Sequence, residues 1–353
     1  MVNTTTQSED TRHTTLTSVP LMRSVRFHGP GDIRVDEIEE PLCGKGQVKM
    51  RPAYVGICGS DLHEYTGGPV LIPKTPHCIT GSTYPAPMGH EFGGIIEAVG
   101  DDVTHLSPGQ RAVVRPTIFD GTCSACKQGY NHCCENIGFI GLSGYGGGMS
   151  KKIVAPAGHF YPIPETISLK AAALIEPLAV AWHAVNLSPF KPGDNVLIVG
   201  GGPIGIGVVQ VLKLQGARHI MCDVAQRVRE ITGGVGADVI FDAAGVEKAL
   251  VSAIPACRVH GTIVNIAVWE KPPSIPVNQL MFHEIRYMGA ALYDEQSFLD
   301  TIRAVNCGQL KPEGMITSCI TLDEVVEKGL KALLEHRDEH CKILVDVQAE
   351  TFT

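Results

Sequence analysis

The stretch Asn195–Gly205 reads N-V-L-I-V-G-G-G-P-I-G and decides the class of the C-terminal half. A short apolar, β-like run is followed at once by the pattern G-x-G-x-x-G, and the next residues are apolar and helix-like. In that pattern the first glycine permits a tight turn, the second lets the backbone approach a pyrophosphate, and the third lets the helix pack on the strand. The helix N-terminus then offers free N–H groups to phosphate. The residues expected to form this dinucleotide site are Gly200, Gly202, Pro203, Ile204 and Gly205.

The glycine pattern alone also fits an ordinary glycine-rich turn, and Asp223 favours the dinucleotide interpretation. Asp223 ends the next β-like run, HIMCD, 18 residues after Gly205. An acidic side chain at this point accepts hydrogen bonds from the adenosine ribose and repels a 2′-phosphate. The sequence therefore predicts NAD, although Arg227 and Arg229 lie close enough to leave NADP open.

The two halves of the chain differ in their periodicity. From Ser24 onward, short β-like stretches alternate with Gly/Pro turns, and no strong helical period appears before about residue 169. This half is predicted to be mostly antiparallel β. From about Gly193, apolar runs alternate with helix-like segments, which predicts an α/β, doubly wound parallel sheet with helices on both faces. The chain ends in a predicted helix, Asp323 to His336, and a last strand, CKILVDV.

Thiol, imidazole and carboxylate side chains occur in motifs that can bind zinc. The first half contains C-G-S-D-L-H at Cys58–His63 and G-H-E at Gly89–Glu91, and Glu176-Pro177 precedes the sheet region. A thiolate, an imidazole and a carboxylate can make a three-ligand zinc site whose fourth position is left for water or substrate. Each residue taken singly also fits a buried thiol or a surface polar group, so spacing alone leaves zinc binding open.

A second cluster of cysteines follows in the first half. Cys123-x-x-Cys126, with Cys133 and Cys134 shortly after, suggests a closed, structural zinc site, and Asp120 is placed to supply another ligand. A redox pair or unconnected thiols are the alternatives. A zinc-finger protein that binds nucleic acid would also fit this cluster by itself.

Charge and composition exclude several classes of protein. The chain has 353 residues, and 29 Lys plus Arg against 37 Asp plus Glu give a net charge of −8. This balance argues against nucleic-acid and anionic-membrane partners, which need clustered positive charge. Residues 1–20 have no apolar segment of the secretory type and are expected to be a disordered tail. The 12 cysteines then indicate thiols or metal ligands before disulfides, and a cytoplasmic protein is expected.

Together these motifs resemble the zinc-containing medium-chain dehydrogenase/reductase (alcohol dehydrogenase) superfamily, in its butanediol and sorbitol dehydrogenase branch. The resemblance covers nearly all of residues 22–347, and MGHEFGGIIEAVG at Met88–Gly100 is highly characteristic. It implies a GroES-like, mostly β catalytic domain at 21–186 and 312–353, with a Rossmann-type NAD-binding domain at 187–311. It also implies a homo-oligomer, with zinc and NAD as cofactors.

The resemblance assigns roles to individual residues. Cys58, His90 and Glu176 match the catalytic zinc ligands, and Glu91 matches an acid that approaches the zinc or its water. Ser60 and His63 match a proton relay. The four positions that match the structural zinc site are Asp120, which replaces the usual cysteine, and Cys123, Cys126 and Cys134. After the later strands come Ile266, Val268 and Leu292, which are expected to flank the nicotinamide, with plain core packing as the alternative.

Two departures from the family pattern stand out. The segment Pro69–Pro87 is longer than in the commonest members and is interpreted as a loop near the substrate entrance, where His77 and Cys78 have ordinary loop roles. The sheet domain is shorter by a helix and a strand after HIMCD. In the strand order 3-2-1-4-5-6 the missing strand is the outer one, so we expect the order 2-1-4-5-6 with the second strand exposed at the edge.

The implied reaction is an NAD-linked interconversion of a secondary alcohol and its ketone, with a vicinal diol such as 2,3-butanediol, or acetoin, as the favoured substrate. A sugar alcohol is the second choice. The competing hypothesis is a catalytically impaired homologue that acts as a binding protein, because the shortened domain loses part of the adenine pocket.

Overall fold

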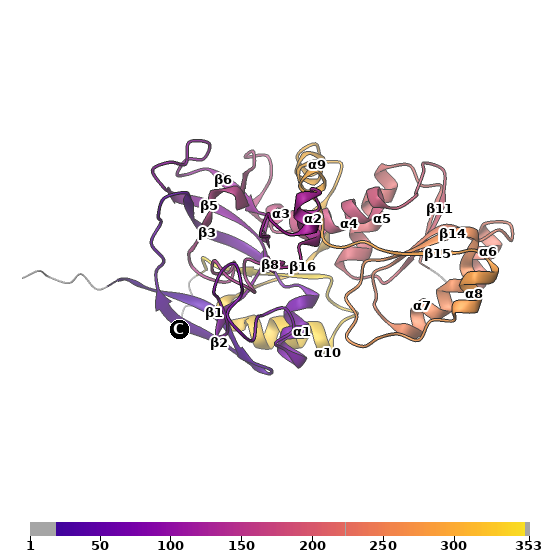
Figure 1. Ribbon diagram of the computed structural model, residues 1–353, viewed down its shortest axis with the longest axis horizontal. Helices are drawn as coiled ribbons and strands as arrows, with labels where there is room; N and C mark the ends of the chain where they lie inside the picture. Colours follow the sequence, from indigo (N-terminus) through magenta and orange to yellow (C-terminus); the bar gives the residue numbers. More distant parts are fainter. Residues whose placement is uncertain (1–18, 223, 350–353) are drawn as a thin grey trace, which may run out of the picture.

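The computed structural model describes residues 19–222 and 224–349. Figure 1 shows two lobes side by side, a β-rich lobe and an α/β lobe, with the helix α4 (Ile175–Leu187) between them. The β-rich lobe contains the first half of the chain and also its last strands. The expected tail falls almost wholly on residues 1–18, and these residues and Asp223 lie outside the described residues.

The β-rich lobe consists of one large sheet and two small ones. The large sheet has the order β10-β6-β5-β3-β17-β16, with β9 also paired to β3, and the small sheets are β2-β1-β4 and β7-β8. All its pairings are antiparallel except β16 with β17, so the predicted mostly antiparallel half is confirmed. The strands are β1 (Leu21–Gly29), β2 (Asp32–Glu39), β3 (Gln47–Gly56), β4 (Ala86–Pro87), β5 (Glu91–Val99), β6 (Arg111–Val114), β7 (Thr117–Ile118), β8 (Gly138–Phe139), β9 (Ile153–Pro156), β10 (Phe160–Pro162), β16 (Ile316–Thr321) and β17 (Lys342–Asp346).

The α/β lobe contains one parallel sheet of five strands. Its order is β12-β11-β13-β14-β15, which is the predicted order 2-1-4-5-6 with the outer strand missing. The second strand, β12, is therefore at the edge, as expected. The strands are β11 (Asn195–Val199), β12 (His219–Met221), β13 (Ala237–Asp242), β14 (Cys257–Asn265) and β15 (Arg286–Gly289).

Helices cover both faces of this sheet because successive strand residues point to opposite sides. Ile198 and Phe241 belong to the hydrophobic core that contains α4 and α5, whereas Leu197 and Ile240 belong to the core on the other face, with α6 and α7. The doubly wound α/β prediction is confirmed. The helices of this lobe are α5 (Pro203–Leu214), α6 (Ala225–Ile231), α7 (Glu247–Ala253), α8 (Val277–Phe282) and α9 (Glu295–Asn306).

Helix prediction was less complete in the β-rich lobe. The first half contains α1 (Gly59–Gly67), which the absence of a helical period before residue 169 did not predict, and the short helices α2 (Ser124–Lys127) and α3 (Leu169–Ala172). Polar residues occupy much of α1, which even buries Asp61 and Glu64, so no apolar stripe announces it. The helix predicted at 323–336 forms as a 3-10 turn (Leu322–Glu324), a π-helix (Val325–Leu330) and α10 (Lys331–Glu335).

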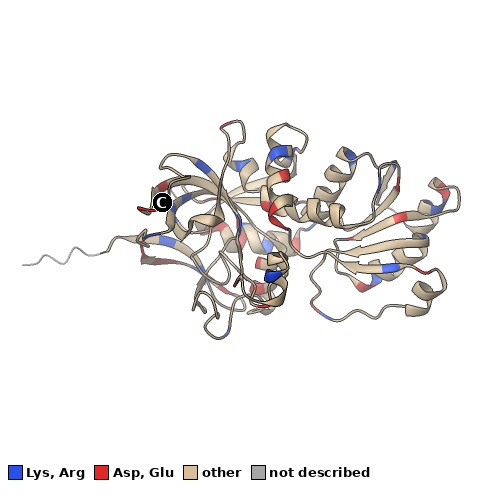
Figure 2. Ribbon diagram, turned by 45° about the horizontal axis from the view of Figure 1, so that its top comes forward, with Lys and Arg blue, Asp and Glu red and all other residues tan. Residues whose placement is uncertain are grey.

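Charge and hydropathy agree with a globular arrangement of these elements. Among the described residues, basic and acidic side chains are interspersed over both lobes (Figure 2). Residues 196–212 carry no charged side chain, and they divide into strand β11 and helix α5. No helix in the described part of the chain has the length and apolar character to cross a bilayer.

Phe241 tests the packing of the parallel sheet. Its ring is fully buried on the central strand β13. We expect Phe241→Ala to lower the free energy of unfolding by about 3–5 kcal/mol, because the substitution removes a buried ring and leaves a cavity. Urea unfolding measures the effect. Val246→Ala, at a side chain that is half exposed, should change the free energy by less than about 0.5 kcal/mol, and equal effects of the two variants would contradict this packing.

Candidate active site and metal centres

The glycine turn has the geometry that a pyrophosphate site needs. Gly200 adopts a φ of +106°, in the left-handed region, and a Cβ on Gly205 would lie 1.9 Å from the carbonyl oxygen of Gly200. Helix α5 begins there with Gly202 as N-cap and Pro203 in its first turn, and no side chain within residues 19–222 and 224–349 caps it. Its first N–H groups are therefore available to a phosphate. The roles expected of the first and third glycines agree with this backbone.

A cavity of about 370 Å³ lies beside the glycine turn, on the side of the edge strand β12. Gly200 and Gly201 form one part of its wall, and residues of helix α7 form another. Its lining residues are Ile198, Val199, Gly200, Gly201, Cys222, Val224, Ala249, Ser252 and Ala253. The position, next to the turn and the end of β12, is where an adenosine would follow a pyrophosphate bound at α5.

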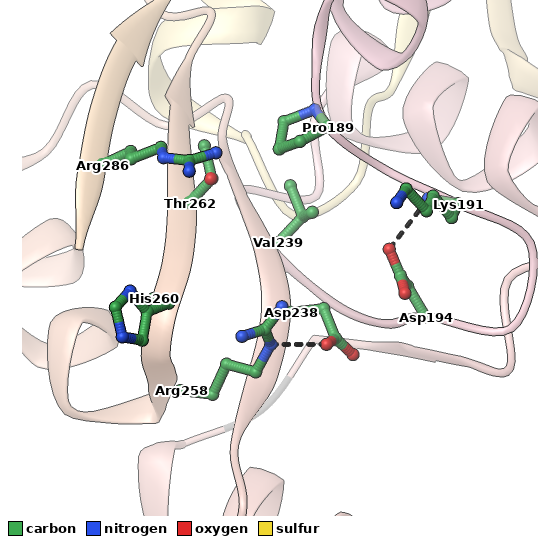
Figure 3. A pocket seen from close by; sticks show the side chains of 9 residues that line it. All are labelled: Pro189, Lys191, Asp194, Asp238, Val239, Arg258, His260, Thr262 and Arg286. Carbon is green, nitrogen blue, oxygen red and sulfur yellow. Dashed lines mark hydrogen bonds and ion pairs between the residues drawn. The ribbon is translucent and has the colours of Figure 1, made fainter. Parts of the chain in front are cut away.

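A second cavity, of about 310 Å³, lies at the opposite edge of the parallel sheet, near the amino ends of strands β13, β14 and β15 (Figure 3). Three of its charged side chains are engaged: the guanidinium of Arg258 donates to Asp238 at 2.6 Å, and the carboxylate of Asp194 accepts from the backbone N–H of Lys191 at 2.8 Å. Parallel α/β sheets bind ligands at their carboxyl ends. This cavity is therefore on the wrong edge for the cofactor. Its lining residues are Pro189, Lys191, Asp194, Asp238, Val239, Arg258, His260, Thr262 and Arg286.

Two of the predicted zinc ligands, Cys58 and His90, lie together in the β-rich lobe with Glu91, the acid predicted to approach the metal. One ligand atom each from Cys58, His90 and Glu91 falls within 4.8 Å of the other two. Cys58 is the N-cap of α1, and Glu91 is the first residue of β5, with His90 immediately before it. The start of helix α1 and the start of strand β5 thus bring together two motifs that lie some thirty residues apart in the sequence.

Asp61 lies behind the histidine of this cluster, and the sequence alone gave it no role. Its side chain is fully buried, with one oxygen accepting from the N–H of Cys58 at 2.9 Å and the other 3.8 Å from Nδ1 of His90. On the opposite edge of the ring, Nε2 of His90 lies 3.3 Å from the hydroxyl of Ser60. A carboxylate behind one ring nitrogen fixes the other toward a metal.

The cluster has the electrostatic character of a cation site. Burial lowers the pKa of His90, but the charges of Cys58 and Asp61 outweigh burial and hold that pKa well above the ordinary 6.5. Two buried polar atoms, Nδ1 of His90 and Oδ1 of Asp61, lack a hydrogen-bond partner among the described residues. A site that favours positive charge so strongly, with sulfur, nitrogen and oxygen donors, fits zinc.

Glu91 is engaged by a lysine from the end of the chain. Nζ of Lys342, in β17, donates to both carboxylate oxygens of Glu91 at 2.7 and 3.0 Å and to the carbonyl of Ile57 at 3.0 Å. Lys342 is almost fully buried, and its pKa is raised because Glu91 and Cys58 outweigh the opposing effect of burial. Lys342 was missed by the sequence reasoning. A lysine inside the apolar run CKILVDV was the available signal, because a buried lysine needs an acidic partner.

Glu176, the third predicted zinc ligand, lies near the cluster but is not part of the three-residue group. It is buried in the first turn of α4 and close enough to His90 and Glu91 to interact with their charges. Burial raises the pKa of Glu176 to about 7, and Glu91 adds to the rise while His90 opposes it. Tyr293, fully buried after β15, is the neighbour from the α/β lobe, and burial followed by the charge of Glu176 raises its pKa.

The residues expected to flank the nicotinamide follow the carboxyl ends of β14 and β15. Ile266 packs against the core that contains α4, whereas Val268 is 64% exposed. Leu292 has a φ of +51°, a left-handed conformation that is strained for a leucine and that clusters at functional sites. His63, on α1, reaches this same edge, where its Nδ1 lies 2.9 Å from a carboxylate oxygen of Glu270.

The second cluster is also assembled. One ligand atom each from Asp120, Cys123, Cys126 and Cys134 lies within 4.8 Å of the others. The carboxylate of Asp120 accepts from the N–H groups of Thr122 and Cys123 at 2.6 and 2.9 Å, and from the side-chain amide of Asn136 at 2.7 Å. Backbone N–H groups, led by that of Cys126, lower the pKa of Cys123. Cys133 is exposed and outside the group, and all twelve cysteines are free thiols.

Comparison with known proteins agrees with this geometry. The family model "Alcohol dehydrogenase GroES-like domain" matches residues 44–165, and "Zinc-binding dehydrogenase" matches residues 219–306. The chain belongs to the zinc-containing alcohol dehydrogenase family. It is an oxidoreductase of the medium-chain class, as its resemblance implied, and the GroES-like and Rossmann-type folds are confirmed.

Relatives of known function cover almost the whole chain. The (R,R)-butanediol dehydrogenases of Bacillus subtilis and Neisseria gonorrhoeae are 36% and 35% identical, and each match spans 92% of this chain and 99% of the relative. The crystal structure of 2R,3R-butanediol dehydrogenase from Bacillus subtilis aligns with a TM-score of 0.85 at 35% identity, over 92% of this chain and 99% of that one. A zinc-binding dehydrogenase from Sinorhizobium meliloti, bound to NADP, aligns over 93% and 99% with a TM-score of 0.80 at 27% identity.

Cys126 tests the second cluster. We expect Cys126→Ala to reduce the zinc bound per chain by about one and to lower Tm, because a structural zinc contributes directly to folding. Mass spectrometry of the metal and thermal unfolding measure both effects. Cys133→Ala removes a neighbouring exposed thiol and serves as the control. Equal zinc contents in the two variants would argue against a metal at Asp120 and the three cysteines.

His183, on α4, predicts a pH dependence of stability. Its ring lies edge-on to His132 at 4.9 Å, and burial lowers its pKa, with Asp294 opposing. Below the ordinary histidine pKa of about 6.5, the unfolded chain therefore binds more protons at this site than the folded chain, and stability is lost as the pH falls. We expect Tm to decline less between pH 7 and pH 5 in His183→Gln. The exposed His336→Gln variant should keep the wild-type slope, and identical slopes in all three proteins would refute the assignment.

Proposed function

We propose that this protein is an NAD-linked, zinc-assisted dehydrogenase that interconverts a vicinal secondary diol, such as 2,3-butanediol, and the corresponding hydroxyketone. The observation that carries the proposal is the cluster of Cys58, His90 and Glu91, which approaches the carboxyl edge of the parallel sheet. Two described contacts support that approach: His63 with Glu270, and Glu176 with Tyr293. In an alcohol dehydrogenase, the metal ligands and the glycine turn that binds the cofactor lie on either side of one reaction centre.

The residues that would hold zinc are Cys58 and His90, with a carboxylate as third ligand. Glu176 is our proposed third ligand, because both oxygens of Glu91 are occupied by Lys342. When bound, zinc acts as a Lewis acid that lowers the pKa of an alcohol oxygen. The carboxylate of Asp61 lies 3.8 Å behind Nδ1 of His90, and the ammonium of Lys342 balances the buried charge of Glu91.

Ser60 and His63 would carry the alcohol proton away. The hydroxyl of Ser60 lies against the His90 ring, and it both accepts and donates a proton without a change of charge. His63 is one turn further along α1 and partly exposed, and the ring nitrogen opposite Nδ1 can accept a proton. A bound nicotinamide would supply the hydride acceptor, and we propose that Leu292, Ile266 and Val268 would flank it.

The cofactor site supports a dinucleotide at the glycine turn. Gly200, Gly202 and Gly205, with Pro203 and Ile204 opening α5, would hold the pyrophosphate. The preference for NAD rests on Asp223, which lies outside the described residues, and remains a prediction. The same fold accepts both forms in other proteins: one aligned dehydrogenase is bound to NADP, and one from Escherichia coli CFT073, at 26% identity and a TM-score of 0.81 over 92% of this chain and 99% of that one, is complexed with NADH.

The diol assignment is supported by the butanediol dehydrogenases among the relatives. A sugar-alcohol substrate and a non-catalytic binding role are less well supported, because relatives at 35% identity across nearly their full length are named as butanediol dehydrogenases. The shortened sheet remains a single parallel sheet with its glycine turn in place.

We also propose that the protein is a cytoplasmic homo-oligomer. Free thiols at all twelve cysteines suit a reducing compartment. On the edge strand β15 and the preceding helix α8, Tyr287, Met281 and Phe282 are 38%, 59% and 77% exposed, and such an apolar edge suits contact with a second copy.

Cys58 tests the proposed function. Cys58→Ala should abolish NAD-dependent oxidation of 2,3-butanediol and remove the catalytic zinc, while the fold is spared, because the thiolate is a metal ligand at the start of α1. Initial rates, zinc analysis and circular dichroism give the three readouts. The control is Cys78→Ala, which removes an exposed loop thiol. Full activity in Cys58→Ala would rule out the mechanism.

A further inference from the structure

A hydrogen bond connects the two lobes next to the proposed reaction centre. Nδ1 of His63, on α1 of the β-rich lobe, lies 2.9 Å from Oε1 of Glu270 in the α/β lobe. The two residues are 207 positions apart in the sequence. Since a carboxylate only accepts, the imidazole donates its Nδ1–H to Glu270.

Glu270 is held in place by the segment that carries it. This segment follows β14, and Asn265, the last residue of that strand, accepts from the indole N–H of Trp269 at 2.8 Å. Trp269 also packs against the hydrophobic core on one face of the parallel sheet. Further along, the N–H of Ser274 donates to the carboxylate of Glu247, at the start of α7, at 2.8 Å. Glu270 therefore lies between two anchored points, directly after a fixed tryptophan.

The exposure of the pair indicates what it contributes. The side chain of Glu270 is 68% exposed, and that of His63 is 28% exposed. Solvent screens such a pair, so the pair adds little to the stability of the fold. Its geometry is nevertheless directional: one end faces bulk water, and the other end is the histidine placed to receive the substrate proton.

We propose that Glu270 is the positioning residue of His63 and the last protein group on the path of the proton to water. This inference rests on the proposed dehydrogenase function. By accepting from Nδ1–H, Glu270 selects the tautomer in which Nε2 of His63 is free to accept a proton. During alcohol oxidation, Nε2 gains the proton of the substrate hydroxyl, and Nδ1 passes its own proton to the Glu270 carboxylate, which releases it to solvent. This step transfers protons only, and no group is oxidised or reduced in it. The oxidation of the alcohol would come from the separate transfer of hydride to a bound nicotinamide.

Glu270→Ala is the variant that tests the proposal. A matched control is Glu284→Ala, because Glu284 is an equally exposed carboxylate of the same lobe and is paired with Nδ1 of His260 at 3.3 Å. We expect Glu270→Ala to keep its zinc content and its affinity for NAD but to lower kcat for 2,3-butanediol about tenfold. The control should match the wild type. In a His63→Gln background, Glu270→Ala should cause no further loss, because it acts only through His63.

A readout independent of turnover comes from the imidazole itself. The ring signals of His63 in long-range ¹H–¹⁵N spectra are identified as those that disappear in His63→Gln. We expect these signals to show the Nδ1–H tautomer in the wild type and a mixture of the two tautomers in Glu270→Ala. Unchanged kcat, unchanged ring signals, or additive losses in the double variant would each overturn the proposal. So would a loss confined to NAD affinity, which would make Glu270 a cofactor contact. If the wild type oxidised no secondary alcohol, the proposed function would fail, while the ring signals would still decide whether Glu270 sets the tautomer.

Discussion

The concentration of acidic groups around one buried imidazole is the constraint on which this molecule depends. Cys58, Asp61, Glu91 and Glu176 all act on His90 or on one another within the protein interior. Burial raises the pKa values of Asp61 and Glu176, and the neighbouring acid Glu91 adds to both rises, so nearby positive charge stabilises the ionised forms of these groups. Lys342 supplies one positive charge from within the chain, the raised pKa of His90 favours a second, and a bound zinc ion would take the place of the proton on His90.

The fold brings the parts of this site together through chain segments that are distant in sequence. Glu91 begins β5, while Lys342 begins β17, a strand that pairs with β3 only after the chain has passed through the α/β lobe. Helix α4 carries Glu176 at its first turn and packs against both α5 and α9. The same helix therefore links the metal ligands to the lobe with the cofactor turn. A change in how the lobes pack would alter both halves of the reaction centre.

The shortened parallel sheet shows how much a fold tolerates at its edge. Loss of an outer strand leaves the central strands β11, β13 and β14 with their neighbours and their helices on both faces. The glycine turn follows β11, in the interior of the sheet, so it keeps its conformation. What changes is the edge: β12 is only three residues long, and a short edge strand limits pairing with other chains.

The sequence alone determined what local chemistry dictates. The glycines at Gly200 and Gly205, the strand–helix alternation and the grouping of cysteines at Asp120–Cys134 all depend on neighbours within a few residues, and the order 2-1-4-5-6 followed from counting elements against the family pattern. Helix α1 escaped prediction because its stability comes from packing and capping instead of an apolar stripe. Only the tertiary structure revealed that Lys342 neutralises Glu91, that Asp61 lies behind His90 and that Glu270 reaches His63. These are single contacts between side chains up to about 250 positions apart, and no periodicity or spacing encodes them, because they arise only when the two lobes and the returning last strand have packed.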